Sequence, residues 1–254
     1  MVWVLDLDGV IWLASVPIPG AADAVGRLRE AGERVVFVTN NSNAPVAAVE
    51  AKLADHGIPA LGDVVTSAQA AATLVEPGER VLVCGGPGVR EAVLARGAEA
   101  VDDDEVVDAV VVGYHREFDY ERMRVAATAV RRGARLLATN DDATYPTPDG
   151  PIPGNGAILA GIVVASGVPP AAVAGKPYRP MADLILARGG GDGWVVGDRP
   201  DTDGRFARTL GYRFALVLSG VTSADDLPVE PEPDAVTRDL ATLVARIASS
   251  GELA

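Results

Sequence analysis

The chain has 254 residues, of which 48% are hydrophobic and 22% charged, and its formal net charge is −13. Such a composition is typical of a globular protein, and the length allows one large domain or two. The negative charge argues against a nucleic-acid partner, because phosphate binding needs clustered cations and the basic residues here are scattered. Neither a membrane-spanning apolar run nor a signal-peptide pattern is present, so we expect a cytoplasmic protein with no membrane partner.

Strand-like and helix-like segments alternate along the chain, which predicts an α/β fold with a parallel sheet. The predicted strands are 2–7, 34–38, 80–84, 109–112, 135–138, 194–196 and 214–218. The predicted helices are 21–30, 45–56, 120–132, 156–166, 180–188 and 238–249. Proline and glycine cluster at 76–78, 146–156 and 169–170, where we expect loops or hinges. The single cysteine, Cys84, lies in a strand-like run and is expected to be a small buried side chain.

Two carboxylates follow the first predicted strand, in the sequence Asp6-Leu7-Asp8-Gly9. On an extended chain, side chains two residues apart point the same way, so Asp6 and Asp8 are expected to converge on one small volume. Two like charges this close need a proton or a metal to compensate them, and oxygen ligands suit Mg²⁺. The pair therefore predicts a magnesium site where the strand opens into a loop.

Three further polar groups follow predicted strands or apolar runs. Thr39-Asn40-Asn41-Ser42 offers hydroxyl, amide and N–H groups that suit an anion, although Thr39 and Ser42 could instead cap the next helix. Lys176 is a candidate phosphate binder. An acidic cluster follows the strand at 194–196 and could supply another metal ligand, best from Asp198, whereas Asp201 and Asp203 could simply solvate a turn. Because ligands bind beyond the carboxyl ends of parallel strands, we expect one phosphate-and-metal site.

These motifs, in this order, resemble those of the haloacid dehalogenase (HAD) superfamily of phosphatases. The resemblance extends over nearly the whole chain to subfamily IIA, the NagD-like or p-nitrophenylphosphatase-like enzymes. Its further marks are Trp12 after the first motif, Gly175-Lys176-Pro177, and the segments 138–140 and 153–156. Each short motif is weak alone, but their joint occurrence in order is specific.

The resemblance implies a doubly wound, Rossmann-like HAD core with an inserted α/β cap domain of the C2 type. It maps the first part of the core to 1–75, the cap to 76–172 and the second part of the core to 173–254. Proline-rich joints near both ends of the insert are what a hinged lid needs.

The resemblance also implies a Mg²⁺-dependent hydrolysis of small phosphate monoesters through an aspartyl phosphate. Asp6 would be the nucleophile, and Asp8 would protonate the leaving oxygen and then deprotonate water. The metal would be held by Asp6, the Asp8 backbone carbonyl and Asp198, with Asp203 orienting that shell. The implied phosphate-binding residues are Thr39, Asn40, Asn41 and Lys176.

In the cap, the resemblance suggests four substrate contacts: His115, Asn140, Asp142 and Tyr145. His115 departs from the family, which commonly has Asp there, so this loop is either more cationic or His115 is a surface side chain. The partner is expected to be a small phosphorylated metabolite whose identity stays open, and a homodimer is plausible from relatives.

Other classes of function remain open from the residues themselves. The run from Val81 to Gly88 superficially resembles a dinucleotide-binding turn, but Glu91 stands where the third glycine of that pattern belongs. A regulatory domain that keeps its aspartyl phosphate, or a phosphate-ester-binding protein without turnover, would use similar motifs. The large insert and Asp8 argue against such a switch.

Overall fold

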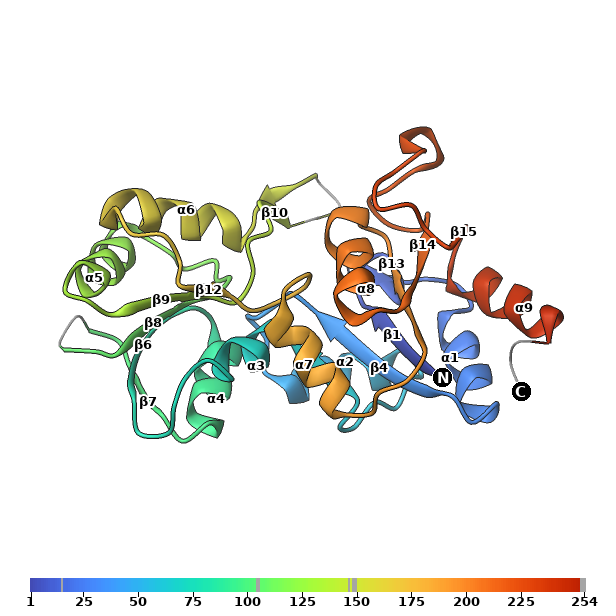
Figure 1. The fold of residues 1–254 in the computed structure, drawn as a ribbon, viewed down its shortest axis with the longest axis horizontal. Helices are drawn as coiled ribbons and strands as arrows, with labels where there is room; N and C mark the ends of the chain where they lie inside the picture. The colour runs from blue at the N-terminus through green and yellow to red at the C-terminus, as the bar shows by residue number, and fades with distance from the viewer. Residues whose placement is uncertain (15, 104–105, 146, 148–149, 252–254) are drawn as a thin grey trace. The chain divides into compact units, whose positions relative to one another are not determined.

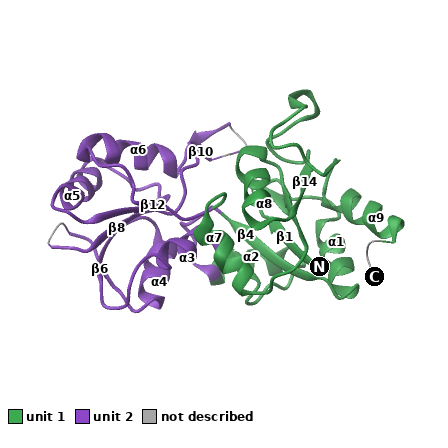
Figure 2. Ribbon diagram, in the orientation of Figure 1, with its two compact units in different colours: residues 1–39, 47–65, 176–254 green, residues 40–46, 66–175 purple. Residues whose placement is uncertain are grey.

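The computed structural model describes residues 1–14, 16–103, 106–145, 147 and 150–251 (Figure 1). Contacts divide the chain into two compact units (Figure 2). Unit 1 comprises 1–39, 47–65 and 176–254, and unit 2 comprises 40–46 and 66–175.

Unit 1 is built on a six-stranded sheet in the order β15-β14-β13-β1-β4-β5. Its strands are β1 (Val2–Asp6), β4 (Arg34–Thr39), β5 (Val64–Thr66), β13 (Gly193–Gly197), β14 (Arg213–Val217) and β15 (Ala235–Thr237). The pairs from β4 through β15 are parallel. The central strands are apolar and buried along almost their whole length, as expected of a parallel sheet covered on both faces.

The helices of this unit are α1 (Ala21–Glu30), α2 (Val46–Asp55), α7 (Arg179–Ala187), α8 (Arg205–Leu210) and α9 (Leu240–Ser250). Helix α1 packs against α9, and α7 packs against α8. A short hairpin, β2 (Trp12–Leu13) with β3 (Val16–Pro17), follows the first strand. A π-helical turn at Pro200–Gly204 precedes α8, and a 3-10 turn lies at Ala224–Asp226.

Unit 2 contains a five-stranded parallel sheet in the order β12-β9-β8-β6-β7. Its strands are β6 (Arg80–Cys84), β7 (Glu99–Val101), β8 (Ala109–Val112), β9 (Arg135–Ala138) and β12 (Ala172–Val173). Its helices are α3 (Ser67–Ala72), α4 (Pro87–Ala95), α5 (Tyr120–Arg131) and α6 (Asn155–Ser166), and a hairpin joins β10 (Thr144–Tyr145) to β11 (Ile152–Pro153). Helices α5 and α6 pack together over a core that includes Leu136 and Ile162.

The α/β fold with parallel sheets is confirmed, and all six predicted helices occur with ends that differ by no more than two residues. Sequence periodicity did not find α3, α4 and α8. Helices α3 and α8 have only six residues each and therefore display too few turns of an amphipathic pattern. Helix α3 did carry a local signal. Thr66 and Gln69 form a capping box, with the Thr66 hydroxyl accepting from the Gln69 N–H and the Gln69 side chain accepting from the Thr66 N–H.

The borders of unit 2 differ from those of the expected insert at 76–172. Helix α3 belongs to unit 2 because it packs against α4. The segment Asn40–Val46 also belongs to it, where a Cβ added at Gly88 would lie 2.3 Å from the Ala44 carbonyl oxygen. The glycines that superficially suggested a dinucleotide-binding turn therefore permit close packing of this segment.

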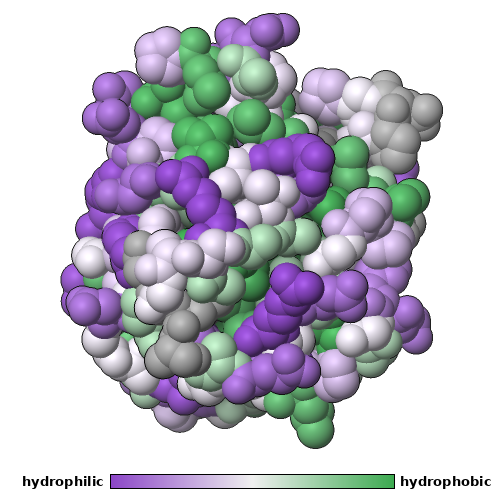
Figure 3. All heavy atoms as spheres, turned by 90° about the vertical axis from the view of Figure 1, so that its right-hand side faces the viewer, coloured by the Kyte–Doolittle hydropathy of each residue, from purple (hydrophilic) through white to green (hydrophobic). Residues whose placement is uncertain are grey.

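The buried state expected of Cys84 is confirmed, since its side chain is 1% exposed and burial raises the pKa of its thiol to about 12. No helix in the described residues is long and apolar enough to cross a membrane. On the face seen in Figure 3, hydrophilic residues are interspersed with smaller hydrophobic areas. Such scattered apolar exposure is normal for a protein surface.

Candidate active site

Three carboxylates meet at the carboxyl ends of adjacent strands in unit 1. Asp6 is the last residue of β1, Asp198 directly follows β13, and Asp203 lies in the turn before α8. Strands β1 and β13 pair in parallel with Leu5 opposite Val196, so their ends lie at the same edge of the sheet. One oxygen of each carboxylate lies within 4.8 Å of the others.

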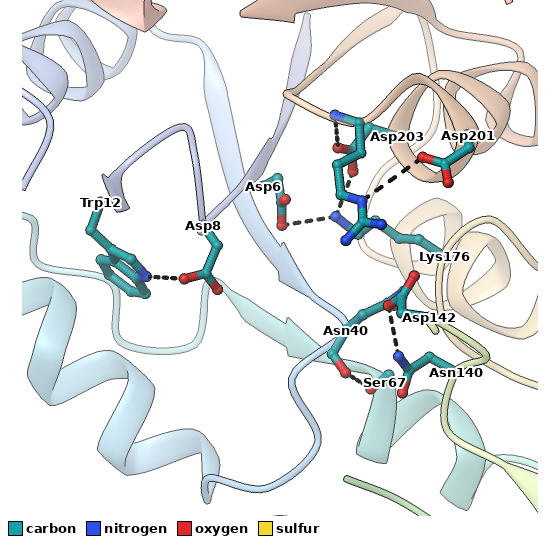
Figure 4. A network of polar contacts seen from close by, with 11 residues as sticks. Asp6, Asp8, Trp12, Asn40, Ser67, Asn140, Asp142, Lys176, Asp201 and Asp203 are labelled. Carbon is teal, nitrogen blue, oxygen red and sulfur yellow. Dashed lines mark hydrogen bonds and ion pairs between the residues drawn. The ribbon is translucent and has the colours of Figure 1, made fainter. Parts of the chain in front are cut away.

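The Lys176 ammonium lies between the carboxylates of Asp6 and Asp203 (Figure 4). Its Nζ lies 2.8 Å from Asp6 Oδ1 and 2.6 Å from Asp203 Oδ1, and its side chain is 3% exposed. Burial alone lowers the pKa of this ammonium, but the charges of Asp203 and Asp6 outweigh burial and raise the pKa above its usual value. Lys176 therefore stays protonated.

The remaining negative charge is poorly compensated by protein groups. Burial, followed by the charges of Asp203 and Asp6, raises the pKa of Asp198 to about 8. Burial also raises the pKa of Asp203 to about 6, although Lys176 opposes the shift. A buried carboxylate held near like charges at neutral pH requires a cation or a proton.

The surroundings of Asp198 hold its carboxylate in place. Its Oδ2 accepts from the Val221 N–H at 2.6 Å, and its backbone carbonyl accepts from the Thr222 hydroxyl at 2.6 Å. Added Cβ atoms at Gly9 and Gly220 would lie 2.3 and 1.9 Å from Oδ2, so only glycine allows the chain to approach this closely. Fixed, buried carboxylate oxygens are the ligands that Mg²⁺ prefers, and the donor set fits that ion.

Asp203 differs from Asp198 in its partners. Its Oδ1 accepts from Lys176, and its Oδ2 accepts from the Arg199 N–H at 3.2 Å. Asp203 is fully buried, whereas Asp201 is largely exposed and pairs with Arg199 at 3.8 Å. The alternative that both residues solvate a turn is therefore wrong for Asp203.

The Asp8 carboxylate is outside this cluster, and its Oδ1 accepts from the Trp12 indole N–H at 3.1 Å (Figure 4). Burial raises the pKa of Asp8, whereas the charge of Lys52 and the bond from Trp12 oppose the shift. A carboxyl with a raised pKa can donate as well as accept a proton.

Thr39 ends β4, which pairs in parallel with β1 so that Asp6 lies opposite Val38. Its side chain is buried and lies at the same edge of the sheet as Asp6. Ser42 is also buried, and its hydroxyl accepts from the Tyr114 N–H at 3.0 Å. The Ser42 hydroxyl thus binds the Tyr114 backbone within unit 2. Ser42 does not cap the next helix, because α2 begins only at Val46.

Within unit 2, the Asp142 carboxylate accepts hydrogen bonds from two side-chain amides. Its Oδ2 accepts from Asn40 Nδ2 at 2.9 Å and from Asn140 Nδ2 at 2.7 Å (Figure 4). The Asn40 carbonyl accepts from the Ser67 hydroxyl at 2.8 Å, and Asn41 Oδ1 accepts from the Asn43 N–H at 3.0 Å. Asp142 therefore fixes the orientation of the Asn40 side chain.

His115 is 7% exposed and meets the Phe118 ring edge-on, with centroids 5.8 Å apart. The expectation of a surface side chain is therefore wrong. Burial, with the nearby Arg122 charge, lowers the pKa of His115, so the ring does not make this loop more cationic at neutral pH. Tyr145 stacks on Tyr114 with ring centroids 5.4 Å apart.

Sequence reasoning missed the environment of Asp8. In the sequence, Trp12 is only a mark of the family resemblance, and Lys52 and His56 have no assigned role beside it. The Lys52 ammonium lies 3.9 Å from the centroid of the Trp12 ring, and the His56 ring centroid lies 5.7 Å from that of Trp12. The spacing of Lys52 and His56 by one helical turn was the available signal.

Two family descriptions match the chain. Haloacid dehalogenase-like hydrolase matches residues 3–99, and HAD-hydrolase-like matches residues 173–243. A D-glycerol 3-phosphate phosphatase of Mycobacterium tuberculosis is 39% identical over 94% of this chain and 69% of its own length. An acid sugar phosphatase of Staphylococcus saprophyticus is 35% identical over 96% of this chain and 97% of its own length.

Solved structures agree with these relatives. A p-nitrophenyl phosphatase from Archaeoglobus fulgidus has a TM-score of 0.90 and 33% identity, covering 96% of this chain and 98% of its own. A glycerol phosphate phosphatase from Mycobacterium tuberculosis, in complex with magnesium, has a TM-score of 0.88 and 38% identity, covering 95% and 76%. The chain belongs to the haloacid dehalogenase-like hydrolases and is a NagD-like phosphatase of subfamily IIA.

Proposed function

We propose that this protein hydrolyses phosphate monoesters of small polyols or sugars, with Asp6 as the nucleophile. Relatives named for glycerol 3-phosphate and for sugar phosphates support this substrate class. The observation that carries the proposed chemistry is the buried cluster in which Asp6, Lys176, Asp198 and Asp203 converge at one edge of the sheet.

In the first step, an Asp6 carboxylate oxygen forms a bond to phosphorus while the bond from phosphorus to the ester oxygen breaks. Asp8 gives its proton to that departing oxygen. In the second step, Asp8 takes a proton from water, whose oxygen attacks phosphorus as the bond to Asp6 breaks. Inorganic phosphate leaves and both carboxyls return to their initial states.

Lys176 stabilises negative charge that accumulates on the phosphoryl oxygens. Asp203 is the positioning residue for Lys176, because its fully buried carboxylate accepts from the Lys176 ammonium at 2.6 Å. Thr39, Asn40 and Asn41 supply further donors to the same oxygens in this proposal.

Asp6, the Asp8 backbone carbonyl and Asp198 would hold Mg²⁺, which when bound neutralises phosphoryl charge and polarises phosphorus. Both Asp203 carboxylate oxygens already accept hydrogen bonds, which favours a role in orienting the metal site over direct binding of Mg²⁺. His115, Asn140, Asp142 and Tyr145 remain predicted substrate contacts. The cytoplasmic location and the homodimer likewise stay predictions.

The test is a phosphate-release screen over glycerol, sugar and aryl phosphates, with Mg²⁺ and with chelator. We expect metal-dependent turnover that Asp6→Asn abolishes, while circular dichroism and thermal unfolding show that the variant is folded. Undiminished hydrolysis by Asp6→Asn would remove the proposed nucleophile. Stoichiometric phosphorylation without phosphate release would instead identify a phospho-accepting regulatory protein.

A further inference from the structure

The carboxyl group of Asp8 is held by one side chain that the proposed chemistry leaves without a role. Trp12 Nε1 donates to Asp8 Oδ1 at 3.1 Å, and the indole is 4% exposed. An indole N–H is a donor only, so it favours an unprotonated oxygen as its partner. When Asp8 carries a proton, this contact therefore favours placing that proton on Oδ2.

The backbone fixes Trp12 relative to Asp8. The Leu7 carbonyl accepts from the N–H groups of Val10, Ile11 and Trp12, and the Trp12 carbonyl accepts from the Gly9 N–H at 2.7 Å. These bonds close a tight loop between the end of β1 and the hairpin that starts at Trp12. The indole thus returns to the carboxylate four residues before it.

Helix α2 secures the indole from another side. Lys52 Nζ lies 3.9 Å from the ring centroid and donates to the Ala14 carbonyl at 2.8 Å. A cation over an indole face is attracted by the ring quadrupole. His56, one turn further along, contacts the same ring. The indole therefore has two contacts that do not involve Asp8, one with the Lys52 ammonium and one with the His56 ring.

We propose that Trp12 is a positioning residue for proton transfer, which orients Asp8 so that Oδ2 delivers the proton to the departing ester oxygen. This inference rests on the proposed role of Asp8 as general acid. It adds that the indole N–H decides which carboxyl oxygen acts, and that Lys52 and His56 support the indole.

The leaving group distinguishes positioning from a merely structural role. An alcohol is a poor leaving group and needs a proton as its bond to phosphorus breaks, whereas p-nitrophenolate leaves readily without one. A misaligned acid should therefore slow an alkyl phosphate selectively.

The experiment compares kcat for glycerol 3-phosphate and p-nitrophenyl phosphate in wild-type protein and in Trp12→Phe, which keeps an aromatic ring and removes the N–H. We expect kcat to fall roughly 10- to 100-fold for the alkyl ester and less than about 3-fold for the aryl ester. The Mg²⁺ concentration for half activation should not change. The matched control is Trp3→Phe, which removes a buried indole N–H that has no hydrogen-bond partner among the described residues and should leave both rates unchanged.

Equal losses on both esters would overturn the proposal, as would unchanged rates. In an Asp8→Asn background, Trp12→Phe should have no further selective effect on the alkyl ester, and a full additional loss there would also refute it. If Trp12→Phe does not fold, Trp12→Met fills the site with a flexible apolar side chain and carries the same expectation. Absence of metal-dependent turnover in the wild type would instead count against the proposed function.

Discussion

Replacing Asp198 with Asn tests whether the buried carboxylates form a cation site. The raised pKa of Asp198, about 8, means that in the metal-free folded protein this group keeps its proton at neutral pH. In an unfolded chain an Asp loses its proton near pH 3.9. Stability from this group is therefore fully present below about pH 4 and is lost as pH rises toward about pH 8.

The two pKa values differ by about four units, which at about 1.4 kcal/mol per unit sets an upper limit of about 5 to 6 kcal/mol on this loss. Structural relaxation and water entry into the metal-free site reduce it, and we expect on the order of 2 to 3 kcal/mol. For a chain of this size that free energy corresponds to a fall in Tm of roughly 4 to 12 °C.

The assay is thermal unfolding between about pH 5 and about pH 8.5. It is run with chelator and with Mg²⁺ for the wild type, for Asp198→Asn, and for the exposed control Asp183→Asn. With chelator, the wild type and the control should lose Tm as pH rises, whereas Asp198→Asn should lose less, because its amide does not ionise and can still accept from the Val221 N–H. With Mg²⁺ the wild type should recover Tm at high pH, and Asp198→Asn should not. Parallel pH curves for all three proteins, or an undiminished effect of Mg²⁺ on Asp198→Asn, would refute the reasoning.

Two other substitutions test the glycine cradle and the core of unit 2. Gly220→Ala places a Cβ 1.9 Å from Asp198 Oδ2 and should weaken Mg²⁺ binding by about tenfold or more. In the control Gly26→Ala, the added Cβ has open space and the affinity for Mg²⁺ should not change. Calorimetric titration of Mg²⁺ measures both affinities, and equal values would contradict the prediction. Leu136→Ala empties a site that is 1% exposed and should lower the free energy of unfolding by about 2 to 5 kcal/mol, against less than about 1 kcal/mol for Leu94→Ala, whose side chain is 53% exposed. Urea titration followed by circular dichroism measures both, and similar losses would show that the packing is misjudged.

The longer strands and most of the longer helices were predictable because their patterns are local, whereas the short strands β5, β7, β12 and β15 were not predicted. The apolar runs that became β1, β4 and β13 need only their own residues to indicate a buried strand. Polar residues immediately after those runs indicated which edge of the sheet carries the chemistry, since parallel strands present their carboxyl ends together. The six-residue helices α3 and α8 are too short to show such a pattern, and their formation depends on packing and capping.

What the sequence by itself determined was the order of the elements, the choice of Asp6, Lys176 and Asp198 as residues at strand ends or next to them, and the family to which they point. Tertiary structure decided the partners of those side chains. Only the folded chain brings Lys176 between Asp6 and Asp203 and places the Lys52 ammonium over the Trp12 ring. Backbone preference is set by neighbouring residues, whereas the partner of a polar side chain depends on how segments distant in sequence pack, and no local pattern encodes that.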